Sequence, residues 1–319
     1  MIVTDAGWAW PWWTALVVIN TVNICVCAWL FRQSRLAPDG QTPYLRSMRI
    51  MGLIFCLVAL YRSVFVSRYL YQYAWFDTLA NSSLLIRTLA WAAELSFAGL
   101  FALAILRFRR DWPSGNTRGP LYRYEAMAPY LLVGCLLLAQ FFATGGLIIK
   151  SRVLFAIEET LWSAGFFAIL PVALLQWLRA YRQRPPDPGQ DYQMLKSFSA
   201  LCLAWCIGYC TFGLVYHLPT EYWASALEQL RTGEPEVKTG MTAVREALYT
   251  VNVTHRFEDW GIGFVIWHTG YFSVCAWIAL FLMRAPRARP DVSRVQPGPG
   301  ATPPTVHRQP VQRTQDSGR

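Results

Sequence analysis

Charged residues are scarce in this chain. Asp, Glu, Lys and Arg make up 15% of its 319 residues, whereas a soluble globular domain carries about 25%. Hydrophobic residues make up 54%, and they gather in runs of roughly twenty, the length that crosses a bilayer as an α-helix. We therefore predict an all-α, polytopic membrane protein built as a bundle of seven transmembrane helices. The predicted spans are Trp13–Phe31, Met48–Val66, Ser83–Leu106, Ala128–Ile149, Val153–Leu178, Phe198–His217 and Trp260–Met283.

Lysine is rarer still, and none lies in the last predicted span. The three lysines are Lys150, Lys196 and Lys238, so a retinal protein, which needs a lysine in its last helix for the Schiff base, is excluded. That span also has one histidine, His268, instead of the H-x-x-x-H pair of the alkaline-ceramidase superfamily. The Asn-Pro-x-x-Tyr motif of G-protein-coupled receptors is missing as well. These residues indicate no known seven-helix family.

Cysteine is absent from the predicted loops and tail, so a disulfide framework is not expected. All eight cysteines fall within predicted spans. Cys202, Cys206 and Cys210 recur every four residues and therefore share one face of a helix. Small side chains with this spacing allow helices to pack closely, and we favour that role over metal binding or redox chemistry.

Basic residues cluster on one side of the predicted membrane. Because cytoplasmic flanks carry the excess of Lys and Arg, we expect the amino terminus outside and the carboxyl terminus in the cytoplasm. The net charge of +10 then faces anionic lipid, and no nucleic acid is needed to explain it. The membrane is expected to be a plasma or inner membrane, or an endomembrane in a eukaryotic cell. The basic flank residues are Arg32, Arg35, Arg46, Arg49, Arg107, Arg109, Arg110, Arg118, Arg123, Arg179, Arg182, Arg184, Lys196, Arg284, Arg287 and Arg289.

Two segments outside the spans have distinct compositions. Residues 218–258, between the last two spans, contain amphipathic pieces after Pro219 and from Met241 to Tyr249, which predict a small helical cap on the outer face. Residues 289–319 lack aromatics and alternate proline with polar residues, so we predict a disordered cytoplasmic tail. The remaining chain, residues 1–288, forms the predicted membrane domain.

Ionisable residues inside the spans are the strongest pointers to function, since each is costly in hydrocarbon unless it is paired or hydrated. They concentrate toward the outer ends of the spans, which predicts a shared polar cavity open to the outside. Structural roles stay open for some of them: Arg62 and Glu94 are placed to form a buried salt bridge, Arg87 is near enough to the interface to snorkel, and Asp77 is placed to cap a helix. The residues concerned are Arg62, Arg87, Glu94, Glu158, Glu159, His217 and His268.

The stretch from His255 to Phe272 has two interpretations. If a helix begins before His255, then His255, Glu258 and Asp259 share a face and could bind a metal. If it begins at Asp259, that carboxylate caps the helix, which we favour. A zinc site would need ligands from several helices, with His217, His255 and Glu258 as candidates. A Glu94–His268 contact would form a proton-handling pair.

Three functions are compatible with these residues. We favour a membrane-embedded enzyme acting on a lipid or amphiphile, with catalytic residues Glu94, His268, Glu158 and Glu159 and substrate-binding residues Arg62, Arg87 and Asp77. A proton-coupled small-molecule transporter would use the same charges as a relay, although the chain shows no internal repeat. A seven-helix sensor or scaffold is the third. Membrane lipids are the expected partners, no protein partner is identifiable, and homo-oligomerisation stays open.

Overall fold

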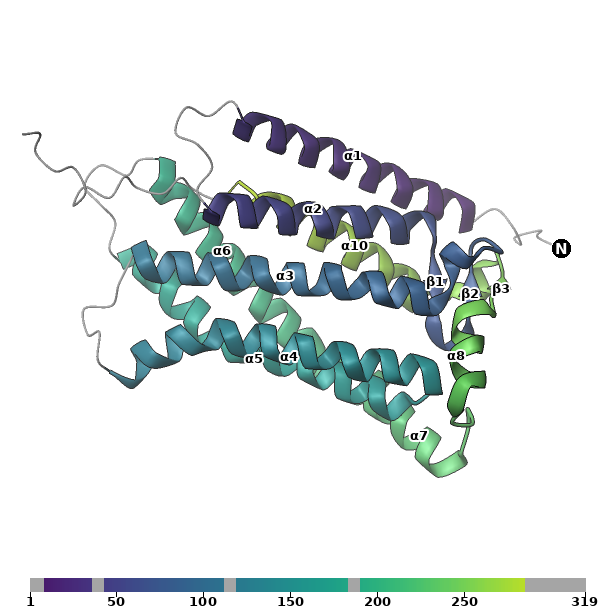
Figure 1. Ribbon diagram of the computed structural model, residues 1–319. Helices are drawn as coiled ribbons and strands as arrows, with labels where there is room; N and C mark the ends of the chain where they lie inside the picture. Colours follow the sequence, from purple (N-terminus) through teal and green to yellow (C-terminus); the bar gives the residue numbers. More distant parts are fainter. Residues whose placement is uncertain (1–8, 36–42, 112–118, 183–189, 285–319) are drawn as a thin grey trace, which may run out of the picture. The chain divides into compact units, whose positions relative to one another are not determined.

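The computed structural model describes residues 9–35, 43–111, 119–182 and 190–284, so the predicted tail at 289–319 lies outside the described residues. Within these ranges the chain is helical apart from short connections, and seven helical segments are long and apolar enough to cross a membrane (Figure 1). The seven predicted spans are therefore confirmed. They are built on α1 (Ala9–Arg35), α2 (Pro43–Val64), α3 (Ser83–Asp111), α4 (Pro120–Ile149), α5 (Arg152–Arg182), α6 (Gln190–Cys210) and α10 (Ile262–Leu282). Five lie within longer helices, whereas Met48–Val66 extends two residues past α2 and Trp260–Met283 extends past both ends of α10.

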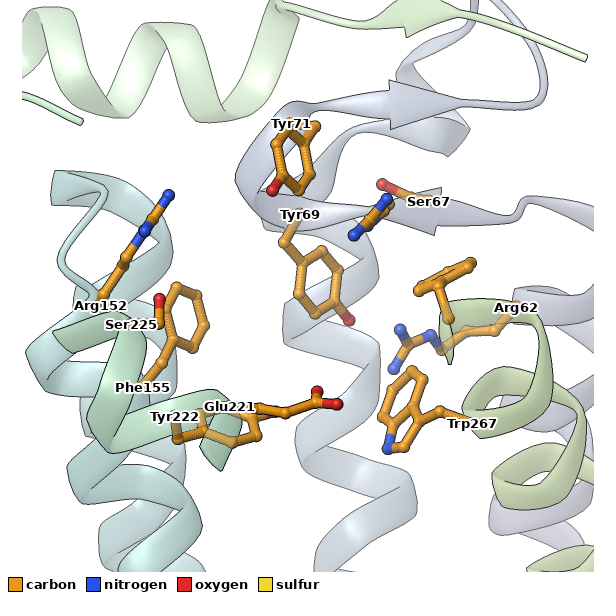
Figure 2. Close-up of a pocket in the computed structure, with 12 residues that line it drawn as sticks. Arg62, Ser67, Tyr69, Tyr71, Arg152, Phe155, Glu221, Tyr222, Ser225 and Trp267 are labelled. Carbon is orange, nitrogen blue, oxygen red and sulfur yellow. The ribbon is translucent and has the colours of Figure 1, made fainter. Parts of the chain in front are cut away.

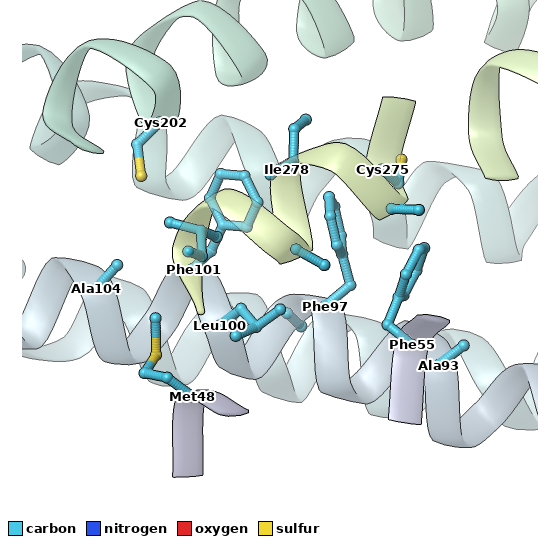
Figure 3. Packing of buried hydrophobic residues seen from close by; sticks show 14 of the residues in the cluster. Met48, Phe55, Ala93, Phe97, Leu100, Phe101, Ala104, Cys202, Cys275 and Ile278 are labelled. Carbon is cyan, nitrogen blue, oxygen red and sulfur yellow. The ribbon is translucent and has the colours of Figure 1, made fainter. Parts of the chain in front are cut away.

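Sequential helices from α1 to α6 pack side by side, and α10 returns to pack mainly against α2 and α1. The main hydrophobic core joins α2, α3, α6 and α10 around Phe55, Phe97 and Phe101 (Figure 3). Cys202, Cys206 and Cys210 are all buried in this core, as their spacing predicts.

The sixth span continues beyond α6 without a break. A π-helical segment, η3 (Thr211–Trp223), follows α6 directly and leads into α7 (Ala224–Thr232). We expected a loop to begin at residue 218, but the helix continues through Pro219 and ends at Gly233, which adopts a left-handed conformation. A π-helix offers wider hydrogen-bond spacing, and that spacing accommodates a proline that would break an α-helix.

Short elements close one end of the bundle, here named the capped end. They are β1 (Ser67–Arg68), η1 (Tyr69–Tyr71), β2 (Tyr73–Ala74), η2 (Leu79–Asn81), α8 (Gly240–Tyr249), β3 (Asn252–Val253) and α9 (Phe257–Trp260). The strands form one small sheet in the order β1-β2-β3, with β1 antiparallel and β3 parallel to β2. The amphipathic piece predicted from Met241 to Tyr249 is α8. The sheet and α8 join the α2–α3 connection to the α7–α10 connection.

Glu246 on α8 links three segments of the capped end. Its carboxylate pairs with the ammonium groups of Lys150 and Lys238, and its carbonyl accepts a 3.2 Å hydrogen bond from Gln72. Lys150 and Gln72 both have positive φ angles, of 56° and 53°, so each ends its helix in the left-handed conformation. Both side chains then reach Glu246, Lys150 at the carboxylate and Gln72 at the backbone carbonyl. Hydrogen bonds from Lys150 and then Lys238 lower the pKa of Glu246.

The start of α10 differs from both predictions for the His255–Phe272 stretch. Neither a continuous helix nor an Asp259 cap is present, because α9 stops at Trp260 and Gly261, with φ +70°, separates it from α10. Asp259 instead accepts a 2.5 Å hydrogen bond from the Thr254 hydroxyl. Arg68 donates to the backbone carbonyls of Asp259 and Trp260 at 2.8 and 3.0 Å, which satisfies carbonyls freed by the break.

Candidate functional site

Five buried or half-buried charged side chains line one cavity of about 380 Å³, here named the central cavity. Arg62 comes from α2, Arg87 and Glu94 from α3, and Glu158 and Glu159 from α5; α6 and α10 complete the wall. The gathering of these charges in one hollow, predicted from the cost of isolated charge in hydrocarbon, is therefore present.

Arg87 is the centre of the charged network. Its guanidinium donates to both carboxylate oxygens of Glu94, at 3.1 and 3.0 Å, and to the Gln140 amide oxygen at 2.5 Å. Glu158 lies 3.5 Å from the same guanidinium. Gln140 also donates to Glu94 at 2.8 Å, so two side chains hold the Glu94 carboxylate.

Glu158 and Glu159 face different neighbours although they are adjacent in sequence. Successive helical residues point about 100° apart, so Glu158 turns toward Arg87 on α3 while Glu159 turns toward α6. There the Tyr209 hydroxyl donates to Glu159 at 2.8 Å. Among the described residues Glu159 forms no ion pair, which makes it the carboxylate of the cavity best placed to give and take a proton.

Arg62 lies buried at one side of the central cavity without an acidic partner. It is 2% exposed, and its guanidinium stacks over the rings of Tyr69 and Phe272 at 5.1 and 4.7 Å. Its Nε has no hydrogen-bond partner, and no acid of the described chain pairs with it. The anticipated Arg62–Glu94 salt bridge is absent, because Arg87 on the same helix holds Glu94.

A second hollow of about 300 Å³, here named the cap-side cavity, adjoins the first (Figure 2). Arg62, Tyr69, Phe155 and Trp267 line both. The cap-side cavity adds two arginines, Arg68 and Arg152, and one carboxylate, Glu221. In Figure 2 Glu221 projects into the cavity from the same side as Arg152, toward Arg62 and Trp267. Burial raises the pKa of the Tyr69 phenol, so this group remains a neutral hydrogen-bond donor.

His268 lies behind Arg62 and lines neither cavity. Its Nε2 donates to the backbone carbonyl of Arg62 at 3.3 Å, and its ring lies 5.1 and 4.6 Å from those of Phe264 and Phe272. The anticipated Glu94–His268 contact is therefore absent. His268 holds the backbone of α2 where Arg62 enters the cavities.

The three metal-ligand candidates do not converge. His217 lines the central cavity 3.6 Å from Glu221, whereas His255 bonds the Trp75 carbonyl at 3.0 Å. Glu258 is exposed and pairs with Arg256. Within the described ranges, no three His, Cys, Asp or Glu side chains are grouped closely enough to hold a metal ion.

Asp77 lies outside both cavities. It is exposed on the α2–α3 connection and caps neither neighbouring helix, since η2 follows Thr78 and the Ser82 hydroxyl accepts from the Leu85 amide at the start of α3. Its proposed substrate contact has no support from its position.

Sequence reasoning missed several polar residues of the site. Gln140 is the second hydrogen-bond donor to Glu94, Tyr209 is the donor to Glu159, and Tyr69 and Tyr271 each have a hydroxyl without a partner. The signal for Gln140 was available, because it is an amide inside an otherwise apolar run. Tyrosine gave no such signal, since it is also typical of the membrane interface.

No protein-family model, curated protein or solved structure matches this chain.

Proposed function

We propose that the protein is a membrane-embedded enzyme that acts on a lipid or another amphiphile in the central cavity. The observation that carries this proposal is the contrast between two adjacent carboxylates. Glu158 faces the Arg87 guanidinium at 3.5 Å, whereas Glu159 faces a neutral phenol at 2.8 Å. Two carboxylates in such different surroundings are suited to separate acid and base roles.

The roles follow from these surroundings. Glu159 would be the general acid or base, with Glu158 as the ionised partner beside the reacting group. Arg87, Glu94 and Gln140 would fix Glu158 in place through their mutual hydrogen bonds. Arg62, which has a free guanidinium, would bind a polar group of the substrate.

An aromatic layer below the cavity favours an enzyme over a carrier. Phe97, Phe101, Phe166 and Trp205 form consecutive ring contacts at 5.1 to 6.0 Å, and the three phenylalanines are fully buried. A carrier would have to separate these rings to release a substrate on the far side. The proton-coupled carrier remains the competing function, because it would use the same carboxylates.

We further propose that the capped end faces outward and that the opposite end of the described helices faces the cytoplasm. Support comes from the Lys and Arg residues at the other end of the described helices, because cytoplasmic flanks are enriched in them. They are Arg46, Arg49, Arg107, Arg109, Arg110, Arg123, Arg179, Arg182, Lys196 and Arg284. At the capped end basic residues are matched by acids such as Glu246 and Glu258.

Reconstitution into nanodiscs of a total lipid extract tests this proposal, with the lipids followed by mass spectrometry. The wild-type protein should convert one lipid class. Glu159→Gln should slow that conversion by about 100-fold or more, the usual contribution of a general acid or base. Glu258→Gln is the matched control, because Glu258 is exposed and away from the cavity. Unchanged lipids with the wild type, together with proton uptake in sealed vesicles that Glu159→Gln abolishes, would establish a carrier instead.

A further inference from the structure

The central cavity opens sideways between α6 and α10. Ala204 and Gly208 on α6 and Val274 on α10 line the cavity and are also exposed. A Cβ atom added at Gly208 or at Gly270 would meet no atom within 4 Å. Because α6 and α10 belong to candidate membrane spans, this opening faces the hydrocarbon of the bilayer.

The two sides of the central cavity differ in chemistry. The charged residues come from α2, α3 and α5, whereas the wall nearest the opening is aromatic and includes Trp205, Trp267 and Tyr271. A hydrocarbon chain that entered between α6 and α10 would lie against these rings, where apolar contact is favourable. The hollow is therefore amphipathic, with its apolar side toward the lipid.

Three unpartnered donors line the cap-side cavity, and two of them, on Arg62 and Tyr69, also line the central cavity. The Nε of Arg62, the hydroxyl of Tyr69 and the Nε of Arg152 are buried without a hydrogen-bond partner, and all three residues line the cap-side cavity. A buried guanidinium without an acidic partner is costly in a membrane protein and marks a functional position. A ligand group with several acceptor oxygens would supply the hydrogen-bond partners that these donors lack.

The side chains that line the cap-side cavity carry a net positive charge, which favours an anionic ligand. Three arginines face a single carboxylate, that of Glu221, which is half-exposed. Arg68 already uses Nη1 on two backbone carbonyls, so it contributes charge more than free donors. Arg62 and Arg152 retain free donors, and planar guanidinium groups are suited to phosphate oxygens.

We propose that the ligand is an amphiphile with an anionic, phosphate-type headgroup. The headgroup binds in the cap-side cavity at Arg62, Arg152 and the Tyr69 hydroxyl, and the hydrocarbon chain leaves through the opening between α6 and α10. This inference rests on the proposed function and names its substrate class. It places the linkage between headgroup and chain in the central cavity, beside Glu158 and Glu159.

Binding to the full-length protein in a neutral detergent tests the proposal by calorimetry, with dodecyl phosphate as the probe. Dodecyl phosphate should bind at least tenfold more tightly than either inorganic phosphate or dodecanol. Equal binding of inorganic phosphate would indicate a soluble anion as ligand. Equal binding of dodecanol would show that the negative charge of the headgroup does not contribute to binding. Either result overturns the proposal.

Variants separate the headgroup from the chain. Arg62→Gln should weaken dodecyl phosphate binding at least tenfold, whereas Arg256→Gln, an exposed arginine near the capped end, should not. Glu221→Gln should tighten binding, which gives a second test should Arg62→Gln fail to fold. Unchanged affinity in both Arg62→Gln and Glu221→Gln would overturn the headgroup assignment.

Gly208→Leu should fill the opening and weaken dodecyl phosphate binding several-fold, and the Cβ of the new side chain has open space around it. Gly263→Leu is the matched control, since Gly263 also has open space but does not line the cavity. Equal binding in both variants would contradict the lateral route. Because these measurements need no turnover, binding that depends on Arg62 in a wild-type protein that converts no lipid would refute the enzyme and leave the ligand class intact. Conversion that Glu159→Gln slows, without binding that depends on Arg62, would refute only the ligand class.

Discussion

The guanidinium of Arg87 holds both carboxylate oxygens of Glu94, seven residues further along the same helix, at 3.1 and 3.0 Å. Both side chains are almost fully buried. The pair is therefore a short, two-pronged ion pair inside a candidate membrane span, and it still leaves the guanidinium 3.5 Å from Glu158 on the neighbouring helix.

Loss of one partner of this pair should destabilise the fold strongly. Glu94→Gln leaves Arg87 without its main acceptor, and breaking a buried ion pair in this way costs about 3–5 kcal/mol. Unfolding in mixed detergent micelles measures the change. Arg231→Gln, which breaks the exposed Arg231–Glu228 pair, should cost about 1 kcal/mol or less. Similar losses in the two variants would show that the Arg87–Glu94 pair is solvated.

The hydroxyl of Tyr209 should matter for activity more than for folding. Tyr209→Phe removes the 2.8 Å hydrogen bond to Glu159 and keeps the ring that stacks on Trp205. A positioned general acid or base contributes about 10²–10⁴-fold to a rate, and loss of the bond that positions Glu159 should remove part of this, so lipid conversion should fall roughly 10- to 100-fold. Tyr216→Phe, an exposed tyrosine on η3, serves as control, and equal rates in the two variants would remove Tyr209 from the mechanism.

Glu246 should make the stability of the capped end depend on pH. Lys150 and Lys238 lower its pKa below the ordinary value of 4.5. The stability that it contributes is therefore complete above that value and is lost as the pH falls through the lowered folded-state pKa. Glu246→Gln should reduce the free energy of unfolding by about 1 kcal/mol at neutral pH, and this difference should vanish in acid. Thermal unfolding across the pH range measures it, and a constant difference would contradict the assignment.

Gly52 should tolerate no larger residue, because it lies where α2 meets the end of α10. A Cβ at this position would lie 2.2 Å from Met283 Cγ, so Gly52→Ala should destabilise by about 1–3 kcal/mol through overpacking. Gly134→Ala on α4 has open space and should stabilise slightly, since alanine favours a helix by up to about 1 kcal/mol. Thermal melts of the two variants should shift in opposite directions; a rise for Gly52→Ala would mean that Met283 moves freely.

Much of the fold was predictable because the lengths of apolar runs decide the spans. The exception was the sixth span, where Pro219 suggested an end and the chain instead continues as η3 and α7. Sequence rules treat proline as a helix breaker, and they do not anticipate a π-helix that accommodates it. The break at Gly261 was equally hidden, since it depends on Arg68, far away in sequence, bonding the carbonyls there.

The candidate site was predictable as a collection of residues but not as a set of pairs. Depth along a helix placed Glu94 near both Arg62 and His268, yet the partner that it takes is Arg87 on its own helix. Depth says nothing about rotation around the helix axis, and rotation turns His268 toward Phe272 and the backbone of Arg62. The same limit explains why His217, His255 and Glu258 stay apart.

A double-mutant cycle on Arg87 and Glu158 tests the shared hollow most directly, because this contact joins α3 to α5 across the central cavity. Arg87→Gln, Glu158→Gln and the double variant would be unfolded under identical conditions. The two residues should show a coupling free energy of at least about 1 kcal/mol, as residues in one ion-pair network do. Effects that simply add, within about 0.3–0.5 kcal/mol, would mean that the charges face separate surroundings and that the cavity does not unite them.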